Sequence, residues 1–174
     1  MPAPEGKTIL ETVRFRCREM TEADADFLAL MLGDAEVMRY YPKPLDRAGA
    51  EDWLVRVRGC YLRTGHGFWM VERLGDGERV GQIGLLPKEI NGRPEVEVAY
   101  MVHRPFWRQG IAAEVALACR DHALGNLGVS RVVSMIHPDN APSLAVAAKL
   151  GMRRIGDILH LGMPHLLFEY RPVP

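Results

Sequence analysis

The feature that most constrains the fold of this chain is a run of strands that turns into an alternation of helices and strands. Three strand-like segments follow one another in the middle of the chain, at residues 68–72, 80–86 and 96–102. The turn signals Asp76-Gly77 and Asn91-Gly92 separate them, and such short turns join antiparallel neighbours. The helical stretch that follows, residues 110–124, is long enough for a crossover to a parallel strand. This order predicts an α+β fold with a mixed, mostly antiparallel central sheet flanked by helices.

The segments around this meander complete the pattern. Near the N-terminus, apolar residues at 13, 15 and 17 alternate with arginines at 14, 16 and 18, the period of a half-buried strand whose arginines face outward. Helices are predicted at residues 21–32, where Thr21 to Asp24 resembles a capping box, and at residues 34–40 and 46–63. A strand at 129–136, a short helix at 142–150 and two further strands follow. With no internal repeat or linker, residues 1–174 are predicted to form a single domain with a core at about residues 12–171.

Charge and hydropathy exclude several classes of protein. The 174 residues contain 22 Lys and Arg against 22 Asp and Glu, so no basic excess points to nucleic acid as a partner. No apolar run is long enough to cross a membrane, and the N-terminus lacks the apolar core of a signal peptide. Three widely spaced cysteines, Cys17, Cys60 and Cys119, are typical of reduced thiols, and no Cys/His spacing suggests a metal site. A cytoplasmic protein without metal, nucleic-acid or membrane partners is predicted.

The segment at residues 95–112 carries the first chemical signal. A strand runs into a short loop, and a helix begins at Gly110. The first N–H groups of a helix lack intrahelical acceptors and lie at the positive end of the helix dipole. Glycine lets an anion such as a pyrophosphate approach the backbone closely. The alternative is a tight strand-to-helix turn that binds nothing.

Several motifs in a fixed order link this segment to a known family. They are RYYP at residues 39–42, GQIGL at 81–85, EVAY at 97–100, WRQGIA at 107–112 and NAPS at 140–143. Together they resemble the GNAT superfamily of acyl-CoA N-acetyltransferases, from about Val13 to Tyr170. Trp107 stands where most of the family has Gln or Arg. That departure, with the other motifs, is typical of the branch that resembles bacterial ribosomal-protein N-terminal acetyltransferases.

The resemblance implies acetyl-CoA as co-substrate, with no metal. Its pantetheine arm would lie along the strand end formed by Met101, Val102 and His103. The pyrophosphate would be held by the backbone N–H groups of a run of six residues: Arg108, Gln109, Gly110, Ile111, Ala112 and Ala113. Arg104 and Arg108 would add positive charge, and Asn140 would hydrogen-bond CoA. A structural role as helix N-cap is the alternative for Asn140.

The resemblance also implies catalytic and acceptor residues. Glu97 falls at the position of the family's glutamate, and a carboxylate there would take a proton from a protonated amine or bind it. A solvated, outward position is the alternative for Glu97. Ser143 would protonate or hydrogen-bond the departing thiolate. Many members use a tyrosine that here is replaced by Ala147, so solvent is the alternative acid. Tyr41 is predicted to contact the acceptor.

These residues predict an N-acetyltransferase. Acetyl would pass from acetyl-CoA to a primary amine by direct attack in a ternary complex, with a protein N-terminal α-amine as acceptor. A small-molecule amine (an amino acid, polyamine or antibiotic) is the alternative acceptor. A non-catalytic acyl-CoA-binding module is the alternative to an enzyme. A homodimer is compatible with the sequence, which does not specify the oligomeric state.

Overall fold

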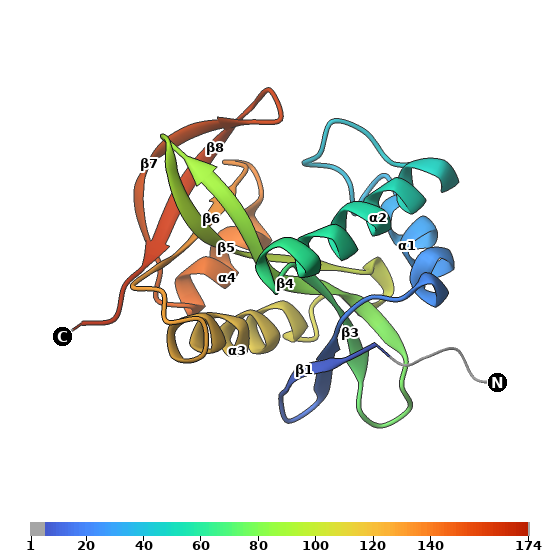
Figure 1. Cartoon of the computed structure of the whole chain (residues 1–174). Coiled ribbons are helices and arrows are strands. Elements are labelled where there is room, and N and C mark those ends of the chain that lie inside the picture. The colour runs from blue at the N-terminus through green and yellow to red at the C-terminus, as the bar shows by residue number, and fades with distance from the viewer. Residues whose placement is uncertain (1–5, 174) are drawn as a thin grey trace.

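The computed structural model describes residues 6–173, and its strands form one sheet in the order β1-β2-β3-β4-β5-β6-β8-β7 (Figure 1). The strands are β1 (Thr8–Glu11), β2 (Phe15–Arg18), β3 (Phe68–Arg73), β4 (Arg79–Ile90), β5 (Arg93–Val102), β6 (Val132–Ile136), β7 (Arg153–His160) and β8 (Met163–Tyr170). The helices are α1 (Ala25–Leu32), α2 (Arg47–Thr64), α3 (Ile111–Gly125) and α4 (Ala141–Lys149), with short 3-10 turns η1 (Glu22–Asp24) and η2 (Arg104–Phe106). None of the described helices is both long and apolar enough to span a membrane.

Tight turns set the antiparallel part of the sheet. At the β4–β5 turn both central residues have positive φ, 51° at Asn91 and 72° at Gly92. This left-handed conformation matches the twist of the flanking strands, and it fixes the register from Ile90 paired with Arg93 to Gly81 paired with Val102. The predicted meander is confirmed, and so is the mixed sheet, because β5 and β6 are parallel.

The parallel pair is the place where the sheet opens. β5 and β6 share one backbone-paired position, Glu97 with Val133. At the next residue the Ser134 hydroxyl donates to the Val98 carbonyl at 2.7 Å, so a side-chain hydrogen bond replaces the backbone pairing there. The carboxyl-terminal halves of the two strands therefore leave room between them for a ligand.

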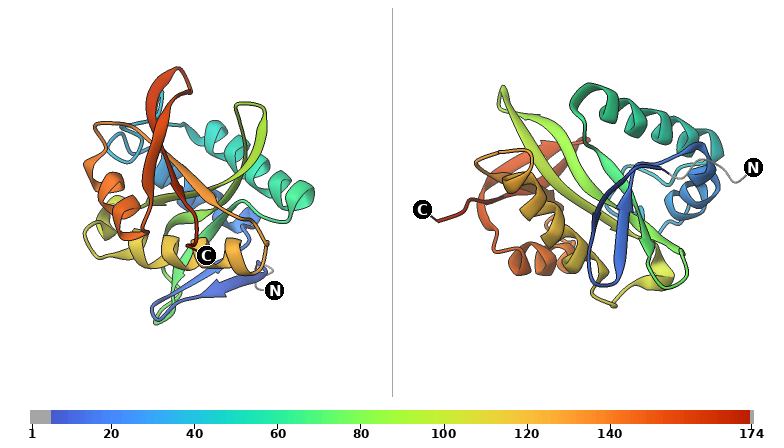
Figure 2. Two further views of the ribbon diagram at one scale, coloured as in Figure 1. Left: turned by 90° about the vertical axis from the view of Figure 1, so that its left-hand side faces the viewer. Right: turned by 60° about the horizontal axis from the view of Figure 1, so that its bottom comes forward.

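Helices cover both faces of the sheet (Figure 2). α1 and α2 pack on one face, where Leu28, Leu54 and Met101 belong to the same apolar cluster. α3 and α4 pack on the other face, where Val115 and Ala147 belong to a second cluster. The two layers hold the loops at the ends of β5 and β6 in fixed positions.

Two expectations for the N-terminal third are corrected. Residues 34–40 form turns rather than a helix, because the segment buries Val37 and Met38 instead of continuing a hydrogen-bond ladder. The segment before residue 12 also contains β1, which pairs with β2. Arg18 does not face solvent: its side chain is buried beside Asp24. The helix predicted at 46–63 is confirmed as α2.

Candidate active site

A cavity of about 800 Å³ lies where β5 and β6 part. Its walls come from the α1–α2 connection, α2, β4, β5, the start of α3, β6, α4 and the β7–β8 hairpin. Tyr40 of the α1–α2 connection closes one side, since its hydroxyl donates to the Asp139 carbonyl at 2.9 Å and its ring lies 5.1 Å from that of His137. Segments far apart in sequence thus form one chamber.

Most of the predicted site residues line this cavity. They are Tyr41, Glu97, Met101, Val102, Arg108, Gly110, Ile111, Ala112, Ala113, Asn140 and Ser143. His103 and Gln109 are not among the lining residues. Arg104 is also outside the lining, and its guanidinium pairs with Asp34 at 2.8 Å. The structure therefore brings the catalytic candidates and most of the CoA-binding candidates together.

The start of α3 has the geometry of an anion site. Gly110 is the N-cap with φ 74°, and Arg108 also has a positive φ of 62°. The first N–H group of this helix with an intrahelical bond belongs to Glu114, which donates to the Gly110 carbonyl at 3.1 Å. The N–H groups of Ile111, Ala112 and Ala113 precede it and lack helical acceptors. These donors fit a pyrophosphate, and so does the positive end of the helix dipole.

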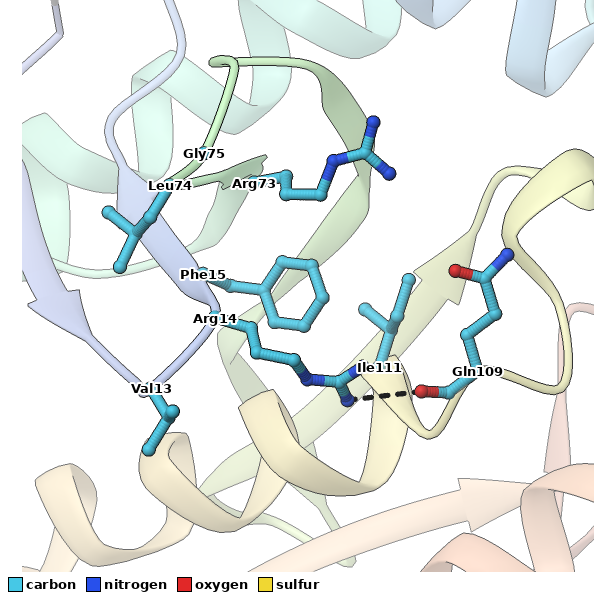
Figure 3. Close-up of a pocket in the computed structure, with 8 residues that line it drawn as sticks. All are labelled: Val13, Arg14, Phe15, Arg73, Leu74, Gly75, Gln109 and Ile111. Atoms are coloured by element: carbon cyan, nitrogen blue, oxygen red, sulfur yellow. Dashed lines mark hydrogen bonds between the residues drawn. The ribbon is translucent and has the colours of Figure 1, made fainter.

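Arg14 anchors this loop from outside the cavity. A second pocket of about 280 Å³ lies behind the loop, and Arg14 donates to the Gln109 carbonyl at 3.0 Å. Figure 3 shows Arg14 reaching toward Gln109 among the residues that line this pocket. The same guanidinium donates to Glu114 in the first turn of α3 at 2.7 Å, and the Thr12 hydroxyl also donates to Glu114 at 2.7 Å. These bonds fix the loop and neutralise a carboxylate close to the proposed phosphate site.

We therefore expect Arg14→Met to weaken binding of CoA about fivefold, the equivalent of one lost hydrogen bond of about 1 kcal/mol. Titration calorimetry with CoA measures this directly. Arg16→Met is the matched control, because Arg16 lies two residues further along, on β2, and pairs with Glu11 at 2.8 Å. Equal affinities in the two variants would show that the loop keeps its shape without the Arg14 guanidinium.

Glu97 is buried in the cavity wall, with 6% of its surface exposed, so it is not the solvated residue of the alternative interpretation. Its Oε2 lies 3.5 Å from the Lys88 ammonium, and its Oε1 accepts from the Met135 N–H at 3.3 Å. Burial raises the pKa of Glu97, and the Lys88 charge and the Met135 hydrogen bond offset that rise only in part. A carboxylate whose pKa is raised is better matched to proton transfer near neutral pH.

The N-terminus of α4 lies in the same wall. Asn140 is its N-cap, and its side-chain carbonyl accepts from the Ser143 N–H at 3.3 Å, as the structural interpretation predicted. The Tyr100 hydroxyl donates to the Ser143 carbonyl at 2.9 Å. Burial, followed by the Glu97 charge, raises the pKa of Tyr100, so this phenol stays protonated. Ala147 is buried in the core and offers no acid.

Comparison with known proteins gives the family. A family model described as an acetyltransferase (GNAT) domain matches residues 14–153. YkkB of Bacillus subtilis (strain 168) is 32% identical over 165 residues, which cover 94% of this chain and 96% of that protein. A crystal structure of an acetyltransferase from Agrobacterium tumefaciens str. C58 has a TM-score of 0.82 at 25% identity, covering 99% of this chain and 96% of that one. A structure of RimL, a ribosomal L7/L12 alpha-N-protein acetyltransferase, shares the fold, with a TM-score of 0.78 at 17% identity over 96% of this chain and 95% of that one.

The fold and these matches define the class of protein: the chain is an acyltransferase. It belongs to the GNAT family of acetyltransferases, which use acetyl-CoA, and the resemblance to that family is confirmed.

Proposed function

We propose that this chain transfers acetyl from acetyl-CoA to the α-amine at a protein N-terminus, by direct attack in a ternary complex. The observation that carries the proposal is that a buried carboxylate, Glu97, lines the same cavity as the unpaired N–H groups at the start of α3. One feature can take a proton from an amine, and the other can hold the phosphates of the donor. RimL, the ribosomal L7/L12 alpha-N-protein acetyltransferase, has the same fold and supports the choice of acceptor.

The residues divide the reaction between them. Glu97 accepts a proton from the ammonium form of the acceptor, and the freed nitrogen attacks the thioester carbonyl. The C–S bond of the resulting adduct then breaks, and the nitrogen loses its second proton to solvent. The CoA thiolate takes up a proton from solvent or from the Ser143 hydroxyl, which solvent then reprotonates. The start of α3 (Arg108 to Ala113) and Asn140 hold CoA, and the pantetheine arm lies along the strand end at residues 101–103. Tyr41 contacts the acceptor. Holding both substrates in one cavity provides the entropic part of catalysis.

An acetylation screen tests this function. The purified chain is incubated with acetyl-CoA and either peptides with free N-termini, N-terminally blocked peptides containing lysine, or small amines (amino acids, polyamines and an antibiotic amine). Thiol release and mass spectrometry should show acetylation of the free N-termini. Turnover with small amines alone would show that the acceptor is a small-molecule amine rather than a protein N-terminus. Binding of acetyl-CoA without turnover of any amine would identify a binding module.

Lys88 is expected to keep Glu97 ionised. The Lys88 ammonium lowers the pKa of Glu97, which burial raises, so Lys88→Met should raise that pKa further. The acidic limb of the plot of kcat/KM against pH should then move to higher pH. The loss of activity should be much larger at about pH 6 than at about pH 9, where the carboxylate is charged in both proteins. Lys88→Arg retains the positive charge and should retain the pH profile. An unshifted limb in Lys88→Met would contradict the pairing.

A further inference from the structure

Arginines without a carboxylate partner gather at the cavity. Among residues 6–173 most arginines form ion pairs, and the five that form none are Arg39, Arg56, Arg63, Arg93 and Arg108. Three of these five, Arg39, Arg56 and Arg108, line the cavity. Arg108 lies at the CoA end, where the phosphates of the donor account for its charge. Arg39 and Arg56 belong to the α1–α2 connection and to α2, on the acceptor side, and the donor does not account for them.

These two guanidinium groups rest on aromatic rings that are themselves held in place. Arg39 lies 5.9 Å from the centre of the Tyr40 ring, whose hydroxyl is bound to the loop before α4. Arg56 lies 5.9 Å from the Trp53 ring. The Trp53 indole N–H donates to Gln82 at 3.0 Å, and its ring stacks on Phe68 at 5.9 Å. Arginine over an aromatic face keeps donors free for a further partner. The positive charge is therefore positioned by the fold.

The other charged groups of the acceptor side do not cancel this charge. The carboxylates that line the cavity are Glu36 and Glu97, and Glu97 is paired with Lys88. Glu36 is exposed. His160 of the β7–β8 hairpin contributes little charge, since burial, Lys88 and His165 lower its pKa to about 4. The acceptor side therefore has the positive charges of Arg39, Arg56 and Lys88 against the negative charges of Glu36 and Glu97. This leaves an excess of positive charge.

We propose that the acceptor amine carries a carboxylate a short distance from the reacting nitrogen, and that Arg39 and Arg56 bind it at the cavity rim. This inference rests on the proposed function and specifies its substrate class. Glu97 lies deep in the wall, whereas Arg39 and Arg56 are exposed at the mouth. The amine therefore enters first and the anionic group stays at the rim, as in a peptide with acidic residues directly after its N-terminal residue.

Peptides that differ only in charge test the proposal. Three peptides share their N-terminal residue and carry Asp, Asn or Lys at the second and third positions. We expect kcat/KM for the Asp peptide to exceed that for the Asn peptide about tenfold at low salt, with a smaller ratio at high salt. In the double variant Arg39→Glu, Arg56→Glu the order should invert in favour of the Lys peptide. Arg63→Glu is the control, since it reverses one arginine on the same helix as Arg56 but outside the cavity, and it should keep the wild-type order.

The outcomes separate this proposal from the proposed function. Equal kcat/KM values for the three peptides would overturn the acidic acceptor while acetylation itself stands, and so would a preference that survives the double charge reversal. If no amine is acetylated, titration of the same peptides into the CoA complex still measures the preference, and equal affinities would overturn it. Free glutamate and glutamine form a second arm. Acetylation of glutamate that depends on both arginines, without acetylation of the Asp peptide, would overturn the peptide as the carrier of the carboxylate.

Discussion

Glu97→Gln is expected to lower kcat for acetylation of a peptide α-amine about 100-fold or more near pH 7, the contribution typical of a general base. The amide keeps the size of the side chain and an oxygen for the Met135 N–H, so the cavity wall should hold its shape. An α-amine with a pKa of about 8 is mostly protonated at pH 7, and the substitution removes the carboxylate that would take that proton. Affinity for acetyl-CoA should be unchanged, which calorimetry can verify.

Two comparisons make the result specific to proton transfer. The defect of Glu97→Gln should shrink as the pH rises to about 9, because solvent then deprotonates the amine. A loss that is equally large at every pH would contradict the role of Glu97 as a base and assign the loss to the shape of the cavity wall. Glu95→Gln makes the same change two residues away on β5, where the carboxylate pairs with Arg131 outside the cavity, and it should retain activity.

The order of strands and helices could be predicted because each signal is local. The Asn91-Gly92 turn, the glycine before α3 and the alternation in β5 each act within a few residues. The helix expected at 34–40 is not formed because this segment is held by distant partners. Tyr40 is bound to Asp139, on the far side of the cavity, and Val37 and Met38 are buried against α1 and α2. No pattern within the segment contains that information.

The site was predictable where backbone geometry determines it, and less so where pairs of side chains do. Gly110 and Asn140 begin helices, and their roles follow from local sequence. Predicting that Lys88 is the neighbour of Glu97 requires the register of the β4–β5 hairpin. Leu86 pairs with Glu97 and Lys88 with Glu95, so Lys88 and Glu97 are diagonal neighbours on one face. The turn at Asn91-Gly92 implies this register, and that signal would have identified Lys88.

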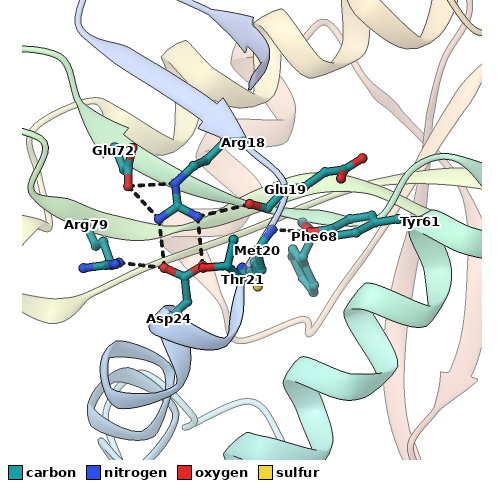
Figure 4. Close-up of polar contacts among 9 residues, drawn as sticks. All are labelled: Arg18, Glu19, Met20, Thr21, Asp24, Tyr61, Phe68, Glu72 and Arg79. Carbon is teal, nitrogen blue, oxygen red and sulfur yellow. Dashed lines mark hydrogen bonds and ion pairs between the residues drawn. The ribbon is translucent and has the colours of Figure 1, made fainter. Parts of the chain in front are cut away.

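Strand periodicity predicted the wrong environment for one charged residue, Arg18, which is buried. Alternation in β2 predicts Arg18 on the solvent face, but the start of α1 covers that face. Asp24 was recognised for its local role, and it does accept from the Thr21 N–H at 2.8 Å. Its longer-range role is to receive Arg18 through both oxygens at 2.8 Å and Arg79 at 2.7 Å, as Figure 4 shows. Glu72 completes the network from β3, at 2.6 Å from Arg18.

Asp24→Asn is therefore expected to lower the free energy of unfolding by about 3–5 kcal/mol, the range for a buried pair that loses one partner. Asp24 is fully buried and Arg18 is 5% exposed, so the substitution leaves a guanidinium in the interior with Glu72 as its remaining carboxylate. Urea denaturation at pH 7 measures the loss, which corresponds to a fall in Tm of roughly 10 °C for a chain of this size. Asp26→Asn is the matched control: it removes an exposed carboxylate two residues away, and surface pairs contribute at most about 1 kcal/mol.

The same network predicts how stability depends on pH. Burial acts to raise the pKa of Asp24, but hydrogen bonds from Arg18 and Thr21 outweigh it and hold the pKa below its ordinary value. A carboxyl whose pKa is lower in the folded state contributes stability above its unfolded pKa of about 4 and loses it as the pH falls through the folded pKa. The difference in unfolding free energy between the native chain and Asp24→Asn should therefore be constant between about pH 6 and 8 and shrink in acid. A difference that persists undiminished in acid would assign the loss to packing rather than to the charge of Asp24.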